Sequence, residues 1–186
     1  MKKLFESVQN FKTKRQEIMD KFEKDLQIVE RNFKKGSDYY NQRMKSLKEE
    51  RDAAISLLKA TGLEEVRQEL ATVRSRIEKV DYTSISPETE KLIARISKMT
   101  DTEKAMVLKN FKGSYQDKKM VCEAMQQPFV KVDDVMADFS YLEESLEGYF
   151  KNYTPDSYNH KCIEHGAMFD TFEETVNGFM AQVGEE

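Results

Sequence analysis

The sequence predicts an all-α protein, and both its composition and its patterning support this fold class. Only 7 Gly and 3 Pro occur among 186 residues, too few for the turn about every ten residues that a β-sandwich or barrel requires. Apolar or seam positions recur at every third or fourth residue from Leu4 to Leu58, with Arg15, Gly36 and Arg51 at three of them, which is the period of a helix. We therefore expect a long N-terminal coiled-coil helix or a helical hairpin, followed by a compact bundle of short helices.

The first predicted element is a long helix with a narrow apolar stripe. From Leu4 to Leu58 the stripe takes 15 steps over 54 residues, an average of 3.6, which matches a nearly straight α-helix. A narrow stripe on an otherwise polar helix is typical of a coiled-coil seam. We predict that this seam mediates self-association through Phe11, Ile18, Phe22, Val29, Phe33 and Leu47. A core-facing hairpin within one chain is the alternative interpretation.

Two glycines are candidate interruptions of the long helix. The stripe keeps step across Gly36, although Gly36 followed by Ser37 also has the local signals of a helix end and a new N-cap. The stripe jumps five residues from Leu58 to Leu63, so we predict the break at Gly62, with a turn at Gly36 left open.

Residues 1–80 form the predicted basic coiled-coil arm, residues 81–86 a connector, and residues 87–183 an acidic helical module. Helix-start signals divide the module: Ser86 before Pro87, Thr100 with a Glu three residues later, and Ser114. Asp133 opens a further predicted helix. Thr154 followed by a proline opens another, and the last helix follows Gly166.

The net charge of −4 conceals two segments of opposite sign. Residues 1–80 carry 19 Lys/Arg and 14 Asp/Glu, a net +5, whereas residues 81–186 carry a net −9. One stretch without Lys or Arg contains six carboxylates: Asp133, Asp134, Asp138, Glu143, Glu144 and Glu147. We interpret it as a docking face for a partner with a basic surface, either a second copy or another protein. A solvated helix face is the alternative.

One small cluster has the residue types of a metal site. His160, Cys162 and His165 fall within six residues, and Cys162 and His165 share a face on a helix. Zinc requires four ligands, so Cys122, Asp156, Asp170 or water would have to complete the site. The alternative is a polar helix end before Gly166, and the prediction for cofactors is none, with zinc left open.

Several functions lack their sequence signals. Phosphate-binding glycine loops, dinucleotide fingerprints and metalloprotease motifs are absent, so we predict a non-enzymatic protein. The sequence contains neither a secretory signal nor a membrane span, and two cysteines favour reduced thiols and a cytoplasmic location. Residues 1–48 are basic, with a net +6, but their interleaved acids are typical of coiled-coil flanks, and direct binding of nucleic acid is only an alternative.

The segment from Met99 to Met125 resembles a helix-turn-helix-like segment in small uncharacterised proteins of phages of Gram-positive bacteria. The matching residues are the Thr-Asp-Thr-Glu start and the Asn-Phe-Lys-Gly-Ser-Tyr sequence before the second helix, where Phe111 and Ser114 replace the Tyr and Asn of the pattern. The resemblance covers about 27 residues and implies a phage or mobile-element origin.

Together these observations predict an oligomerising interaction protein of the phage capsid-assembly or virion-associated kind, located in the bacterial cytoplasm or the virion. The alternative is a phage-encoded inhibitor, of the anti-CRISPR or another anti-defence type. Its acidic surface would bind a nucleic-acid-binding protein of the host.

Overall fold

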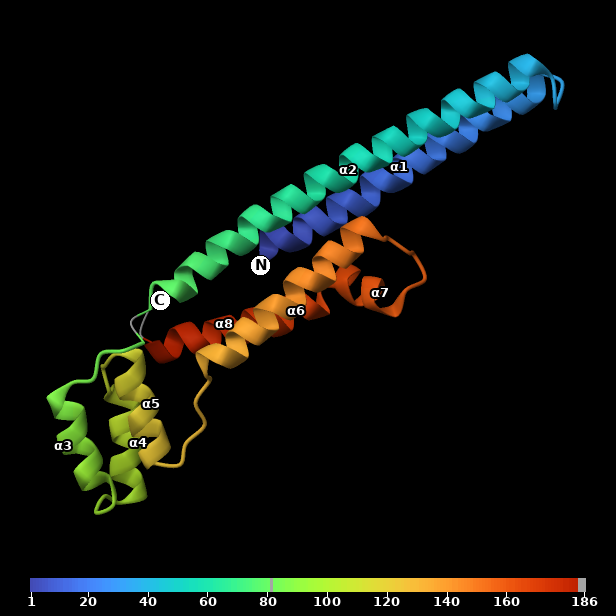
Figure 1. Cartoon of the computed structure of the whole chain (residues 1–186). Helices are drawn as coiled ribbons and strands as arrows, with labels where there is room; N and C mark the ends of the chain where they lie inside the picture. Colours follow the sequence, from blue (N-terminus) through green and yellow to red (C-terminus); the bar gives the residue numbers. More distant parts are fainter. Residues whose placement is uncertain (81, 184–186) are drawn as a thin grey trace. The chain divides into compact units, whose positions relative to one another are not determined.

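The computed structural model describes residues 1–80 and 82–183, and within this range all regular structure is helical. This confirms the predicted all-α class (Figure 1). Two long helices are followed by shorter ones, and the helices are α1 (Lys2–Asn32), α2 (Asp38–Glu78), α3 (Pro87–Ile96), α4 (Asp101–Asn110), α5 (Tyr115–Ala124), α6 (Val132–Lys151), α7 (Tyr158–Glu164) and α8 (Ala167–Val183).

The chain reverses at Gly36, so α1 and α2 form an antiparallel hairpin (Figure 1). Phe33 leaves α1 in an extended conformation, and Gly36 has φ +85°, a left-handed conformation that glycine adopts without a Cβ penalty. The Ser37 hydroxyl accepts a hydrogen bond from the Tyr40 backbone N–H at 3.3 Å and caps α2. The turn that the sequence left open is therefore present.

The predicted break at Gly62 is wrong, because α2 runs without interruption from Asp38 to Glu78. Gly62 is itself a buried stripe position, which gives regular four-residue steps from Leu58 through Gly62 and Val66 to Leu70. The absence of a side chain at Gly62 lets the Phe150 ring of α6 approach the backbone of α2, because a Cβ added at Gly62 would lie 2.4 Å from Phe150 Cε1. Counting Leu63 as the stripe position produced the apparent jump.

The described chain divides into two compact units, and their boundaries differ from those of the predicted arm, connector and module. Unit 1 contains residues 1–70 and 143–169, and unit 2 contains residues 71–142 and the chain after residue 169. The boundaries lie inside α2, α6 and α8 rather than in a linker, because each of these helices contributes residues to both units. Asp81 of the predicted connector lies outside the described residues.

The core of unit 1 forms where the start of α1 meets the end of α6. Phe11 is 1% exposed, and its ring centroid lies 4.9 Å from that of Phe150 and 5.6 Å from that of Tyr149, in edge-on contacts. Burial of one such ring contributes about 1.5–3 kcal/mol to stability. Farther along the hairpin, Val29 packs against Tyr40 and Leu47 in a cluster formed by α1 and α2 alone.

The helix starts in unit 2 largely follow the predicted capping signals. The Ser86 hydroxyl accepts from the Thr89 N–H, with Pro87 at the first helical position. Thr100 and Ser114 each begin a capping box, so the predicted starts of α3, α4 and α5 are confirmed. In unit 1, by contrast, α7 begins at Tyr158 rather than at Thr154.

Asp117 joins the N-terminal ends of α3 and α5. The Ser86 N–H donates to its Oδ1 at 2.8 Å and the Ser114 N–H donates to its Oδ2 at 3.2 Å, while the residue is only 3% exposed. Burial raises the pKa of this carboxyl, but the hydrogen bonds from Ser86, Thr89 and Ser114 lower it more, and the net pKa is lowered.

Asp117→Asn is expected to lower the free energy of unfolding by about 1 kcal/mol, because the amide directs its NH₂ group at one of two backbone N–H donors. Asp101→Asn is the matched control, since Asp101 lies in the first turn of α4 with a fully exposed side chain. Urea unfolding followed by circular dichroism measures both. Equal midpoints for the two variants would show that the bridge between α3 and α5 contributes nothing.

Candidate interaction surfaces

A buried carboxylate in unit 1 anchors α7 to α1. Glu164 has a side chain only 7% exposed, and its Oε2 lies 2.7 Å from Lys12 Nζ. Its Oε1 accepts from the Tyr153 hydroxyl at 2.8 Å and from the Tyr149 hydroxyl at 3.2 Å. Gln9 Nε2 donates to the Glu164 backbone carbonyl at 2.6 Å. The side chain and backbone of one residue thus connect α1, α6 and α7.

The electrostatics of this cluster keep Glu164 charged and the tyrosines protonated. Burial raises the pKa of Glu164, but hydrogen bonds from Lys12, Tyr153 and Tyr149 lower it more, and the net pKa falls below the usual value. Burial, followed by the bond to Glu164, raises the pKa of Tyr153 to about 12, and burial also raises the pKa of Tyr149. The hydroxyls of Tyr149 and Tyr153 thus stay protonated and donate to Glu164, which holds the Glu164 carboxylate in position.

An open cleft of about 690 Å³ lies beside this cluster in unit 1. Its lining is mixed in charge, since Lys12, Arg15 and Lys161 lie near Glu17 and Asp20. Arg15 covers the Tyr153 ring at 4.6 Å. This lining has no single sign of charge, so it does not define one class of ligand.

The seam assigned to self-association packs within the chain. Phe11 is buried against the end of α6, and Val29 and Leu47 are buried between α1 and α2. Phe22 and Phe33 pack half-buried against the same cluster, and Ile18 lines a small cleft of the hairpin. The stripe is therefore covered by the chain's own helices, as the hairpin interpretation requires. Self-association stays a prediction, and it needs another surface.

The six carboxylates of the predicted acidic face have different surroundings. In unit 2, Asp133, Asp134 and Asp138 are exposed on α6, followed by Tyr141, which is 63% exposed. The spacing 134, 138 and 141 places the last three of these on one helix face.

In unit 1, Glu144 is exposed and Glu143 is half-buried. Glu147 forms ion pairs with Lys151 at 2.6 Å and Arg67 at 2.7 Å. Hydrogen bonds from these two cations lower the pKa of Glu147 to about 2. Glu147 is therefore already paired with cations of the same chain. The exposed carboxylates Asp133, Asp134, Asp138 and Glu144 are the ones available for docking.

The predicted metal ligands do not come together in the structure. His160 Nδ1 accepts from the Thr154 N–H at 2.9 Å, and its ring stacks on Tyr153. Cys162 interacts with the exposed Tyr158, while His165 is the C-cap residue that follows α7. Across residues 1–80 and 82–183, no group of three or more His, Cys, Asp or Glu has the arrangement of a metal site.

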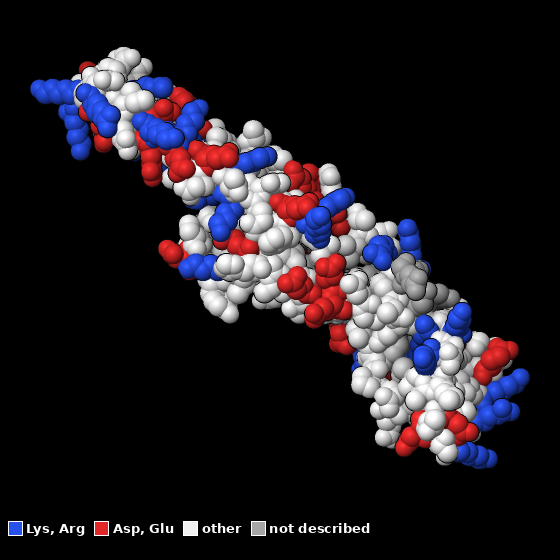
Figure 2. All heavy atoms as spheres, turned by 180° about the vertical axis from the view of Figure 1, so that it is seen from behind, with Lys and Arg blue, Asp and Glu red and all other residues white. Residues whose placement is uncertain are grey.

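The loop end of the hairpin carries an exposed surface that the sequence interpretation missed. Ile28 and Tyr39 are 54% and 60% exposed, next to the exposed Arg31, Lys34 and Lys35. These five residues are called the hairpin end below, and Figure 2 shows Lys and Arg side chains gathered there. Ile28 and Tyr39 each directly precede a stripe residue. A large apolar side chain next to the stripe was therefore the sequence signal that could have indicated this exposed surface.

No helix among the described residues is long and apolar enough to cross a membrane. A scan against family models gives no match, and neither the curated proteins nor the solved structures contain a significant match to this chain. The proposals below therefore depend on the geometry of the chain itself.

Proposed function

We propose that the protein is a non-enzymatic interaction protein that self-associates head to tail, with the hairpin end of one copy bound to the acidic part of α6 in another. The observation that carries the proposal is the hairpin end, where Ile28 and Tyr39 are exposed beside three cations. Large exposed apolar side chains rimmed by charge are typical of interaction sites. An assembly or virion-associated role in a phage is the biological setting that we propose for this association.

The two surfaces are complementary in charge and in character. The segment 28–39 has Arg31, Lys34 and Lys35 against the exposed Glu30 and Asp38, a net +1, whereas the exposed part of α6 from residue 133 to 141 has three aspartates and no Lys or Arg. Each surface also has an exposed tyrosine, Tyr39 on one and Tyr141 on the other. Tyrosine contributes large contact area at low entropic cost, and opposite charges steer the encounter and fix its register.

A contact between two different surfaces has consequences for the assembly that forms. Head-to-tail contacts leave one free surface at each end of the assembly, so further copies can add until the rotation between copies closes a ring. Species larger than a dimer therefore accumulate as the protein concentration rises. Salt weakens attraction between exposed charges because the Debye length is about 8 Å at physiological ionic strength. We therefore expect the mass measured by light scattering to rise with protein concentration and to fall with added salt.

A charge exchange tests the pairing directly. Lys34→Glu with Lys35→Glu, or Asp134→Lys with Asp138→Lys, should each give a monomer, because both surfaces of the variant then have the same sign. An equimolar mixture of the two double variants should associate again, because each surface then meets one of opposite charge. Lys14→Glu with Lys91→Glu is the control, since both lysines are exposed, Lys14 in the first half of α1 and Lys91 on α3, and neither belongs to the hairpin end or to α6. A wild-type protein that stays monomeric up to millimolar concentration overturns the proposal.

The exposed acidic part of α6 also favours a second candidate function, that of an anti-defence inhibitor. Asp134, Asp138 and Tyr141 present two charges and an aromatic ring on one face, which is a chemistry suited to a nucleic-acid-binding groove. In host lysate, an inhibitor would retain one defence protein and lose it in the Asp134→Lys, Asp138→Lys variant. An assembly factor would retain a capsid protein instead.

A further inference from the structure

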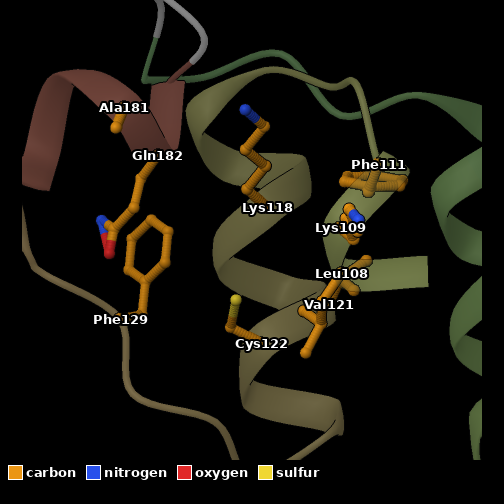
Figure 3. Close-up of a pocket in the computed structure, with 9 residues that line it drawn as sticks. All are labelled: Leu108, Lys109, Phe111, Lys118, Val121, Cys122, Phe129, Ala181 and Gln182. Carbon is orange, nitrogen blue, oxygen red and sulfur yellow. The ribbon is translucent and has the colours of Figure 1, made fainter. Parts of the chain in front are cut away.

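Unit 2 contains a cavity of about 330 Å³ formed by residues from four segments. Figure 3 shows these segments: the end of α4, the middle of α5, Phe129 in the loop before α6, and the end of α8. The lining residues are Leu108, Lys109, Phe111, Lys118, Val121, Cys122, Phe129, Ala181 and Gln182. The volume lies at the lower end of the range of about 300–1,000 Å³ that small-molecule sites occupy.

The walls of this cavity combine apolar and polar side chains, and contacts with neighbouring residues hold Phe129 and Gln182 in place. Phe129 and Gln182 lie on one side, opposite α5 (Figure 3). The Phe129 ring packs edge-on against buried Tyr115 at 5.1 Å. Gln182 accepts from the Val130 N–H at 2.9 Å and donates to the Val130 carbonyl at 3.2 Å, which ties the end of α8 to the loop. Preformed walls of this kind reduce the ordering cost of binding.

The charges at the cavity have one sign. Lys109 and Lys118 are its charged lining residues, and neither forms an ion pair with a carboxylate among the described residues. Burial lowers the pKa of Lys118, because the charged ammonium loses part of its hydration. The neighbouring Cys122 supplies no negative charge, since burial raises the pKa of its thiol.

We propose that this cavity binds a small organic anion with an aromatic or short-alkyl body and one carboxylate or sulfonate group. The apolar body packs between the half-buried Leu108 and Phe129, and the anionic group pairs with Lys118. The apolar lining side chains favour the body. The Lys118 ammonium, which pairs with no carboxylate among residues 1–80 and 82–183, favours anions over neutral molecules of equal shape. This site lies within unit 2 and is independent of the self-association proposed above.

Calorimetric titration with 2-naphthoate and with its neutral counterpart 2-naphthalenemethanol tests the proposal. We expect the anion to bind about tenfold more tightly than the alcohol, and Lys118→Gln to remove that difference. Lys119→Gln is the matched control, because it removes the same charge from the next residue of α5, which does not line the cavity. Equal binding of anion and alcohol by the wild type, or equal losses in the two variants, overturns the proposal.

The Cys122 thiol locates the bound molecule independently. In a Cys162→Ser background, saturating 2-naphthoate should slow alkylation of Cys122 by iodoacetamide severalfold, because the molecule covers the sulfur. Phe129→Ala opens the wall, and we expect it to remove this protection even if the variant is less stable. An unchanged alkylation rate in the presence of bound naphthoate places the anion elsewhere and contradicts the assignment.

Discussion

Gly62→Ala is expected to lower the free energy of unfolding by about 2 kcal/mol, although alanine is the better helix former. The new Cβ would lie 2.4 Å from Phe150 Cε1 and 2.9 Å from Phe150 Cδ1. The Phe150 ring has little room to move, because it is fully buried and contacts the rings of Phe11 and Tyr149 edge-on. Overpacking of this kind forces either the ring or the backbone to shift.

Gly148→Ala provides the opposite expectation on a neighbouring helix. Gly148 lies inside α6, and a Cβ there would meet no atom within 4 Å. The substitution should therefore raise the free energy of unfolding by about 0.5–1 kcal/mol through helix propensity alone. Urea unfolding of both variants measures the two signs. A stabilising Gly62→Ala would show that the close approach of α2 and α6 is absent.

Glu164→Ala is expected to lower the free energy of unfolding by about 3 kcal/mol, because the buried hydroxyl of Tyr149 and the Lys12 ammonium lose their common acceptor. Glu164→Gln keeps the shape but not the charge, so we expect a smaller loss of about 2 kcal/mol. Glu23→Gln is the exposed control, for which we expect a change below about 0.5 kcal/mol.

The pH dependence separates the charge of Glu164 from its packing. Its pKa in the folded protein is lowered relative to an unfolded value of about 4.3, so its stabilising contribution is complete above that value. The contribution is lost as the pH falls through the folded pKa. The advantage of the wild type over Glu164→Gln should therefore shrink between about pH 6 and pH 3. Equal differences at both pH values would assign the effect to packing alone.

Local signals were sufficient to predict the fold class and several helix starts. The period of 3.6 identified the long helices, and the side chains of Ser86, Thr100 and Ser114 cap the helices that they predicted. These features depend on residues within one or two turns, which the sequence displays directly.

Features that depend on distant residues were not predictable in this way. Gly62 reads as a break until Phe150, 88 positions later, is known to pack against it. The sequence pattern placed the start of α7 at Thr154. In the structure, the Thr154 N–H donates a hydrogen bond to the His160 side chain instead, and a sequence pattern cannot indicate this contact. Glu164 is likewise unremarkable in the sequence, since its partner Lys12 lies near the opposite end of the chain.

Each unit is formed by two stretches that are far apart in the sequence, and this limits the order in which the chain can fold during synthesis. The hairpin of α1 and α2 is complete early, but the aromatic partners of Phe11 follow about 140 residues later at Tyr149 and Phe150. A nascent chain stopped after residue 142 would therefore leave Phe11 without the rings of Tyr149 and Phe150 that it packs against. Quality-control proteases would meet such truncated products as an open apolar surface, whereas only the finished chain conceals it.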